Sequence, residues 1–82
     1  MTFLKRLGKV LHLSTHGNLI IRLEDGTLPR MNTKVVTTKM ERVGSVYDIF
    51  GPESSPYVSV RLDKRMLASK AKALINDRLY TA

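Results

Sequence analysis

Apolar and polar positions alternate with a period of two along most of this chain, which is typical of half-buried β-strands. In the first segment, Leu7, Leu11 and Leu13 are expected to share one face, together with the stem of Lys9. Val10 and His12 are expected on the opposite face. Five further strands are predicted, at residues 19–23, 34–37, 43–50, 57–62 and 78–81.

Glycine, proline and asparagine separate these strands. Gly8 lies inside the first strand and predicts a bulge or tight bend. Turns are predicted at residues 15–18 and 24–26, and Pro29 keeps its segment out of a central strand because proline lacks an N–H. The longest strand is expected to end in a corner at residues 51–56.

The period changes near the C-terminus. Leu67, Ala71, Leu74 and Ile75 are spaced i, i+4, i+7 and i+8, which predicts one short helix. Asp63 precedes this run and is expected to be its N-cap. The fold class is therefore all-β, a single domain over residues 1–82 that forms a small six-stranded β-barrel with one short helix.

Composition narrows the possible functions. The 82 residues carry a net charge of +7 and no cysteine, so disulfides and thiolate metal sites are excluded. With His12 and His16 as the two imidazoles, a zinc site is not expected, and neither is a cofactor. We expect no membrane span and no targeting signal, and therefore a cytoplasmic protein. The basic charge fits a solvated surface and a nucleic-acid-facing surface equally well.

The sequence does not suggest an enzyme. Its carboxylates are scattered over turns and strands, so no acid–base pair is evident. Ser14 and His16 are neighbours in sequence, but we interpret them as turn residues. The five glycines are isolated and none precedes an evident helix, so no phosphate-binding loop is predicted.

The corner is the most distinctive segment. Phe50 and Tyr57 flank it, and Pro52 and Pro56 would hold it ordered and lower the entropic cost of binding. Base stacking is the weaker interpretation, because aromatic residues make up 6% of the chain and the corner carries Glu53 and no cation. Whether the two rings fill the barrel or form an apolar docking surface stays open. Asp48 either hydrogen-bonds the corner's backbone amides, the option we favour, or faces solvent.

At this corner the chain resembles the Gar-type subunit of H/ACA ribonucleoprotein particles, which convert uridine to pseudouridine under RNA guidance. The family pattern is approximately V-G-x-V-x-D-[IV]-F-G-P followed by P-Y-x-x-[VI]. The matching residues are Val43, Gly44, Val46, Asp48, Ile49, Phe50, Gly51, Pro52, Pro56, Tyr57 and Val60. The glycine-arginine-rich tails of eukaryotic members are absent, so the chain looks archaeal in type. Residues 63–75 are outside the familiar pattern.

The resemblance implies a barrel similar to those of translation factors and a non-catalytic accessory role in rRNA pseudouridine synthesis and ribosome biogenesis. Such subunits dock on the catalytic domain of a dyskerin-type pseudouridine synthase and assist loading and release of substrate RNA, with indirect or weak contact to the guide RNA particle. The residues expected to form or shape the docking surface are Val46, Ile49, Phe50, Gly51, Pro52, Pro56 and Tyr57.

Two alternatives accompany this hypothesis. The net charge of +7 also suits a stand-alone basic RNA-binding β-barrel, whose affinity would fall steeply with salt. An apolar docking surface without its partner can also self-associate, so a homodimer of the isolated chain is conceivable.

Overall fold

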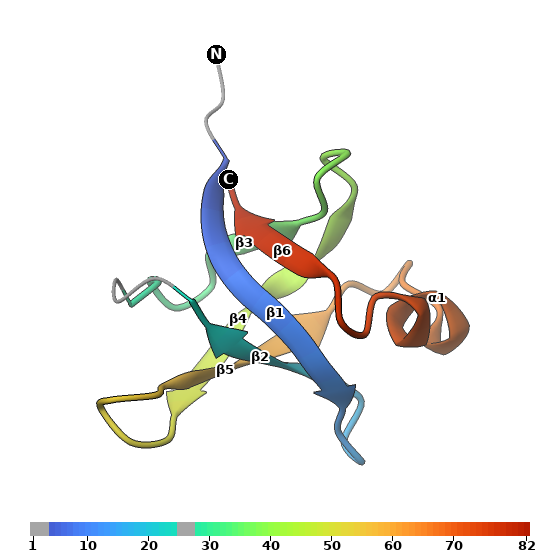
Figure 1. Cartoon of the computed structure of the whole chain (residues 1–82). Coiled ribbons are helices and arrows are strands. Elements are labelled where there is room, and N and C mark those ends of the chain that lie inside the picture. Colours follow the sequence, from blue (N-terminus) through green and yellow to red (C-terminus); the bar gives the residue numbers. More distant parts are fainter. Residues whose placement is uncertain (1–3, 25–27) are drawn as a thin grey trace.

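A computed structural model describes residues 4–24 and 28–82. Within these residues, six antiparallel strands close into a barrel in the order β1-β2-β5-β4-β3-β6, which confirms the predicted all-β fold (Figure 1). Closure leaves no long unpaired edge. The elements are β1 (Lys5–Leu13), β2 (Asn18–Leu23), β3 (Lys34–Val36), β4 (Arg42–Phe50), β5 (Tyr57–Leu62), α1 (Ala68–Ala73) and β6 (Arg78–Thr81).

The barrel interior is a cluster of aliphatic side chains supplied by every strand. Val58 and Val60 of β5 and Leu19 and Ile21 of β2 are fully buried, as their alternation predicts. The cluster consists of Leu7, Val10, Leu19, Ile21, Leu23, Val35, Val43, Val46, Val58, Val60, Ala71 and Leu79. No described buried side-chain nitrogen or oxygen lacks a hydrogen-bond partner.

The side-chain facing predicted for β1 is wrong. Leu7 and Val10 are both buried, whereas Leu11 and His12 are both exposed. The reason is two shifts in pairing, with β6 between Arg6 and Gly8 and with β2 between Val10 and His12. Each shift is a β-bulge that breaks the period of two.

The bulge predicted at Gly8 is confirmed. The pairing of β1 with β6 shifts between Arg6 and Gly8. A Cβ atom at Gly8 would collide with the carbonyl oxygen of Arg22 on the neighbouring strand β2. Glycine is therefore needed here for the close approach of two backbones.

The short helix is confirmed, but its start differs from the prediction. Leu67 occupies the N-cap position and makes no side-chain capping bond, while Asp63 instead pairs with Arg42 at 3.2 Å. Ala71 is the buried residue of α1, whereas Leu67, which begins the apolar spacing, is 68% exposed. Leu74, just past the helix, packs partly against the core.

The connection between β1 and β2 is the predicted tight turn. Gly17 has a φ of 82°, and the N–H of Asn18 donates to Oγ of Ser14 at 3.1 Å. Most of the turn predicted at residues 24–26 lies outside the described residues. No helix among the described residues is long and apolar enough to cross a membrane.

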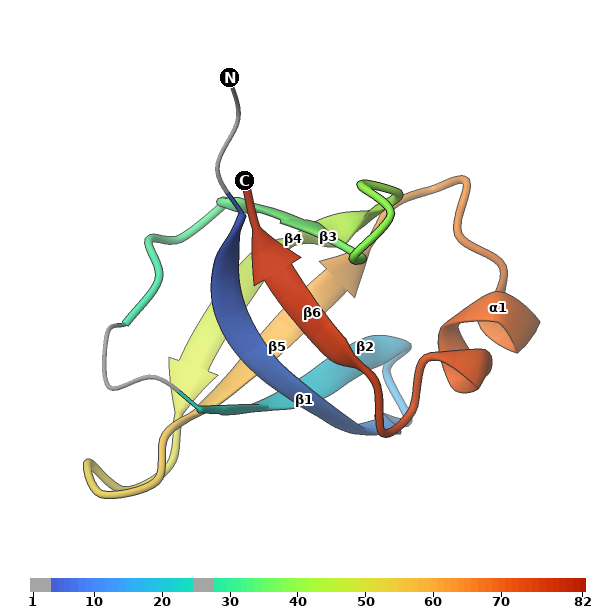
Figure 2. The same ribbon diagram turned by 45° about the horizontal axis from the view of Figure 1, so that its top comes forward.

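The two ends of the β4–β5 ribbon lie on opposite sides of the barrel. One end is the loop of residues 51–56, and the other leads from β5 into α1. Figures 1 and 2 both place this loop and α1 far apart, with the barrel between them.

Candidate docking site

The loop between β4 and β5 carries an ordered aromatic pair. Phe50 ends β4 and Tyr57 begins β5, and the two residues are directly opposite in the ladder. Their ring centroids are 5.7 Å apart and the ring planes are inclined by 28°. Phe50 is 43% exposed and Tyr57 is half-buried, so the Phe50 ring lies on the surface and not in the barrel core.

Gly51 lets the chain turn under this pair. Its φ of 93° lies in the region that favours glycine, and a Cβ atom there would be 2.7 Å from Cδ2 of Tyr57. The N–H of Ser55 closes the loop onto the carbonyl of Pro52 at 3.0 Å. The carbonyl of Pro56 accepts the N–H of Leu23 at 3.2 Å, which ties the corner to the end of β2.

A groove of about 470 Å³ runs along the corner. Five of the seven residues predicted for docking line it. The sequence prediction missed Leu28 and Glu24, which barrel closure brings to the same groove; an exposed leucine next to Pro29 in a polar loop was the available signal. The lining residues are Leu23, Glu24, Leu28, Ile49, Phe50, Gly51, Pro52, Glu53, Ser54 and Pro56.

Two expectations about β4 need correction. Val46 is 0% exposed, so its side chain packs inside the barrel and cannot belong to a surface. The Asp48 carboxylate accepts the N–H of Ile49 at 2.8 Å, a bond inside the strand and not in the corner. The Ile49 side chain itself is half-buried, packs against the core and also lines the groove.

A bulge in β4 explains both the burial of Val46 and the exposure of Asp48. Val46 is opposite Val60 and Asp48 is opposite Ser59, so Tyr47 is the extra residue. The bulge breaks the alternation, and Tyr47 and Asp48 are both exposed.

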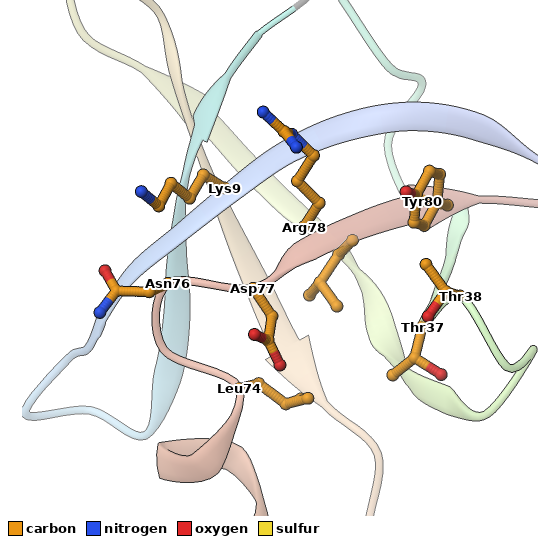
Figure 3. A pocket seen from close by; sticks show the side chains of 9 residues that line it. Lys9, Thr37, Thr38, Leu74, Asn76, Asp77, Arg78 and Tyr80 are labelled. Carbon is orange, nitrogen blue, oxygen red and sulfur yellow. The ribbon is translucent and has the colours of Figure 1, made fainter.

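A second groove, of about 490 Å³, lies between β6 and the β3–β4 connection (Figure 3). Its lining includes Asp77, Thr37 and Thr38, a set of residue types that could suggest a nucleophile and its base. Yet Oγ1 of Thr37 accepts the backbone N–H groups of Lys39 and Glu41, both at 3.2 Å, and so organises a turn. We find no pairing of nucleophile and base in this groove.

The charged groups around the sites are solvent-exposed. The Arg78 guanidinium donates to the Glu24 carboxylate at 2.8 Å and lowers the pKa of that carboxyl below its usual value. A hydrogen bond from the Lys70 ammonium, at 2.9 Å, lowers the pKa of Glu41 in the same way. No cluster of three or more metal-ligating side chains occurs among the described residues.

Fold and corner together define the class of protein: a small antiparallel β-barrel domain whose β4–β5 loop is flanked by a stacked aromatic pair. The model of the Gar1/Naf1 RNA binding region matches residues 4–82, and the chain belongs to that family. This agrees with the family resemblance inferred from the sequence.

Two relatives and one solved structure are similar to this chain. An uncharacterized protein of Methanothermobacter thermautotrophicus is 34% identical over 77 residues, which is 94% of this chain and 82% of that protein. A probable H/ACA ribonucleoprotein complex subunit 1 of Dictyostelium discoideum is 36% identical over 53 residues, 65% of this chain but 22% of the longer protein. The Gar1 domain of Naf1 shares the fold, with a TM-score of 0.77 at 20% identity over 98% of this chain and 86% of that one.

Proposed function

We propose that this chain is a non-catalytic accessory subunit of an RNA-guided pseudouridylation particle. Its corner docks on the catalytic domain of a dyskerin-type pseudouridine synthase, and the docked barrel assists loading and release of substrate RNA. The single observation that carries the proposal is the apolar groove in front of Phe50, lined by five of the seven residues expected to dock.

The exposure of Phe50 supports docking at this corner. Phe50 presents 43% of its surface to solvent on a loop that two prolines and Gly51 hold in shape. An aromatic ring on a pre-ordered loop binds with little loss of conformational entropy, and such rings often dominate interface energies. Most of the residues that line the groove are apolar, so the contact is expected to be mainly apolar.

One relative supports membership of an H/ACA assembly. The Dictyostelium relative is named as a probable subunit of the H/ACA complex, and we extend that assembly to this chain. On this proposal the synthase performs the uridine chemistry and the barrel contributes no reacting group. The cytoplasmic location and the possible homodimer stay predictions.

The first experiment is co-elution with the synthase, without RNA, in high salt. Apolar docking survives salt, whereas a contact made mainly of surface charges weakens. We expect the Phe50→Ala variant to lose co-elution and the Tyr47→Ala variant to retain it, because Tyr47 is an equally exposed aromatic residue of the same strand that lies outside the groove. A chain that binds the synthase only through RNA contradicts the proposal.

The second candidate is the stand-alone RNA-binding barrel. It is favoured by the net charge of +7 and by the description of the family as an RNA binding region. It predicts that the isolated chain shifts RNA in a gel at physiological salt. Absence of a shift there removes RNA binding as the main function and leaves docking in place.

A further inference from the structure

Charge is segregated along the β4–β5 ribbon. Residues 48–57, at the corner end, contain two acids and no cation, whereas residues 61–72, at the opposite end, contain five cations and one acid. We call the latter set the basic end. It comprises Arg61, Lys64, Arg65, Lys70 and Lys72.

Four of these cations have no acidic partner among the described residues. Lys70 forms an ion pair with Glu41 at 2.9 Å. Asp63, the acid of the segment, forms an ion pair with Arg42 of β4. The exposed cations that form no ion pair with the described acids are Arg61, Lys64, Arg65 and Lys72. The positive charge of this end is therefore available to an anionic partner.

The same end holds an exposed stacking group. The Arg61 guanidinium carbon lies 4.4 Å from the centre of the Tyr47 ring, and Tyr47 is 48% exposed because the bulge in β4 turns it outward. His16 and Asn18, from the turn between β1 and β2, complete a groove of about 560 Å³ around the pair. Nucleic-acid bases stack on tyrosine rings and on guanidinium planes alike.

We propose that the basic end binds single-stranded RNA, with Lys64, Arg65 and Lys72 on phosphates and a base stacked on the Tyr47–Arg61 pair. Unpaired cations alone would suit an acidic protein surface equally well. The stacked pair beside them favours a ligand with both phosphates and planar bases. The inference deepens the proposed function, since it locates the RNA contact within the particle at the end opposite the docking corner.

The two ends are expected to act independently. Along β5, Tyr57 of the corner and Arg61 of the basic end are four residues apart, which corresponds to about 13 Å at about 3.3 Å per residue. The Debye length at physiological ionic strength is about 8 Å, so charge changes at the basic end are screened from the corner.

The test measures binding of a labelled single-stranded oligouridine to the full chain by fluorescence anisotropy, over a series of salt concentrations. The variant Lys64→Gln/Arg65→Gln/Lys72→Gln removes three charges. Its matched control, Lys5→Gln/Arg30→Gln/Lys34→Gln, removes three exposed charges elsewhere. We expect the first variant alone to lower the slope of log affinity against log salt, by about 2, since each phosphate contact on a single strand contributes about 0.7.

A second pair of variants tests stacking. Tyr47→Ala is expected to weaken binding about fivefold or more with the salt slope unchanged, whereas Tyr47→Phe keeps the ring and the affinity. No binding at the lowest salt, equal effects of the two triple variants, or equally tight binding of polyglutamate overturns the inference. Co-elution with the synthase in high salt is measured on the same variants. If the basic-end variant loses it, the two ends are not separate; if even the unaltered chain fails to co-elute, docking fails while the RNA result stands.

Discussion

Gly51 gives the sharpest test of how the corner is built. The substitution Gly51→Ala adds one methyl group, which has to occupy a position 2.7 Å from the Tyr57 ring on a backbone with a φ of 93°. Gly17 provides a matched control. Its φ is 82°, but a Cβ atom there meets nothing within 4 Å. The two substitutions share the backbone strain and differ in the displaced ring.

The expected magnitudes follow from these two geometries. An L-residue at positive φ costs about 1–2 kcal/mol, and the reduced freedom of the unfolded chain offsets about 0.4–1 kcal/mol of that. Gly17→Ala should therefore lower the free energy of unfolding by about 1 kcal/mol. Gly51→Ala also displaces Tyr57 from Phe50, and loss of an aromatic pair adds about 0.5–1.5 kcal/mol, for a total of about 2 kcal/mol.

Urea denaturation followed by circular dichroism measures both variants. With a slope of about 1 kcal/mol per molar urea for a small domain, the midpoints of the two variants should differ by about 1 M. The Kd for the synthase, measured at a urea-free condition where both variants are folded, should rise for Gly51→Ala and not for Gly17→Ala. Equal midpoints together with equal affinities would refute the argument that Gly51 sets the position of the aromatic pair.

Three other predictions concern the barrel and its charges. Val46→Ala should lower the free energy of unfolding, measured by urea denaturation, by about 2 kcal/mol because the side chain is fully buried. The synthase affinity of the folded variant should be unchanged. A soluble, stable variant that loses docking would contradict the assignment of Val46 to the barrel core. Gly44→Ala should prevent a native circular dichroism spectrum, because its Cβ would collide with the Arg61 carbonyl oxygen of β5; a native spectrum argues against so close an approach of β4 and β5. NMR titration should show the pKa of Glu24 rising toward 4.5 in Arg78→Gln, since the guanidinium lowers it. The stabilising effect of the pair is present above pH about 4.5 and is lost as the pH falls through the lowered pKa. An unchanged Glu24 titration in the variant would contradict this cause of the shift.

Local patterns predicted the strands whose alternation is unbroken. The bounds of β5 and β6 agree with the sequence prediction because Val58, Val60 and Leu79 alternate regularly with polar or half-exposed neighbours. Where a bulge intervenes, the same rule gives the wrong face. The bulges near Gly8 and after Val10 misplaced Leu11, and the bulge at Tyr47 decides that Val46 is core while Tyr47 is surface.

The candidate site could be predicted only in part, because closure of the barrel brings further residues to it. The corner residues are contiguous in sequence, so the sequence could predict that they act together. Leu28 and Glu24 come from the segments that follow β2, and only the tertiary fold brings them to the groove. Asp63 was predicted as the helix N-cap, but it forms an ion pair with Arg42 on the neighbouring strand β4 instead. Capping preferences consider only residues near the helix start and therefore could not predict this pair.

Docking of the corner on the synthase through an exposed aromatic ring is the central proposal. The most direct measurement is isothermal titration of the synthase catalytic domain with the chain and with its Phe50→Ala and Tyr47→Ala variants, in high salt and without RNA. We expect a Kd about 30-fold or more weaker for Phe50→Ala, as for an interface hot spot, and an unchanged Kd for Tyr47→Ala. A folded Phe50→Ala variant that binds as tightly as the unaltered chain would contradict the proposal.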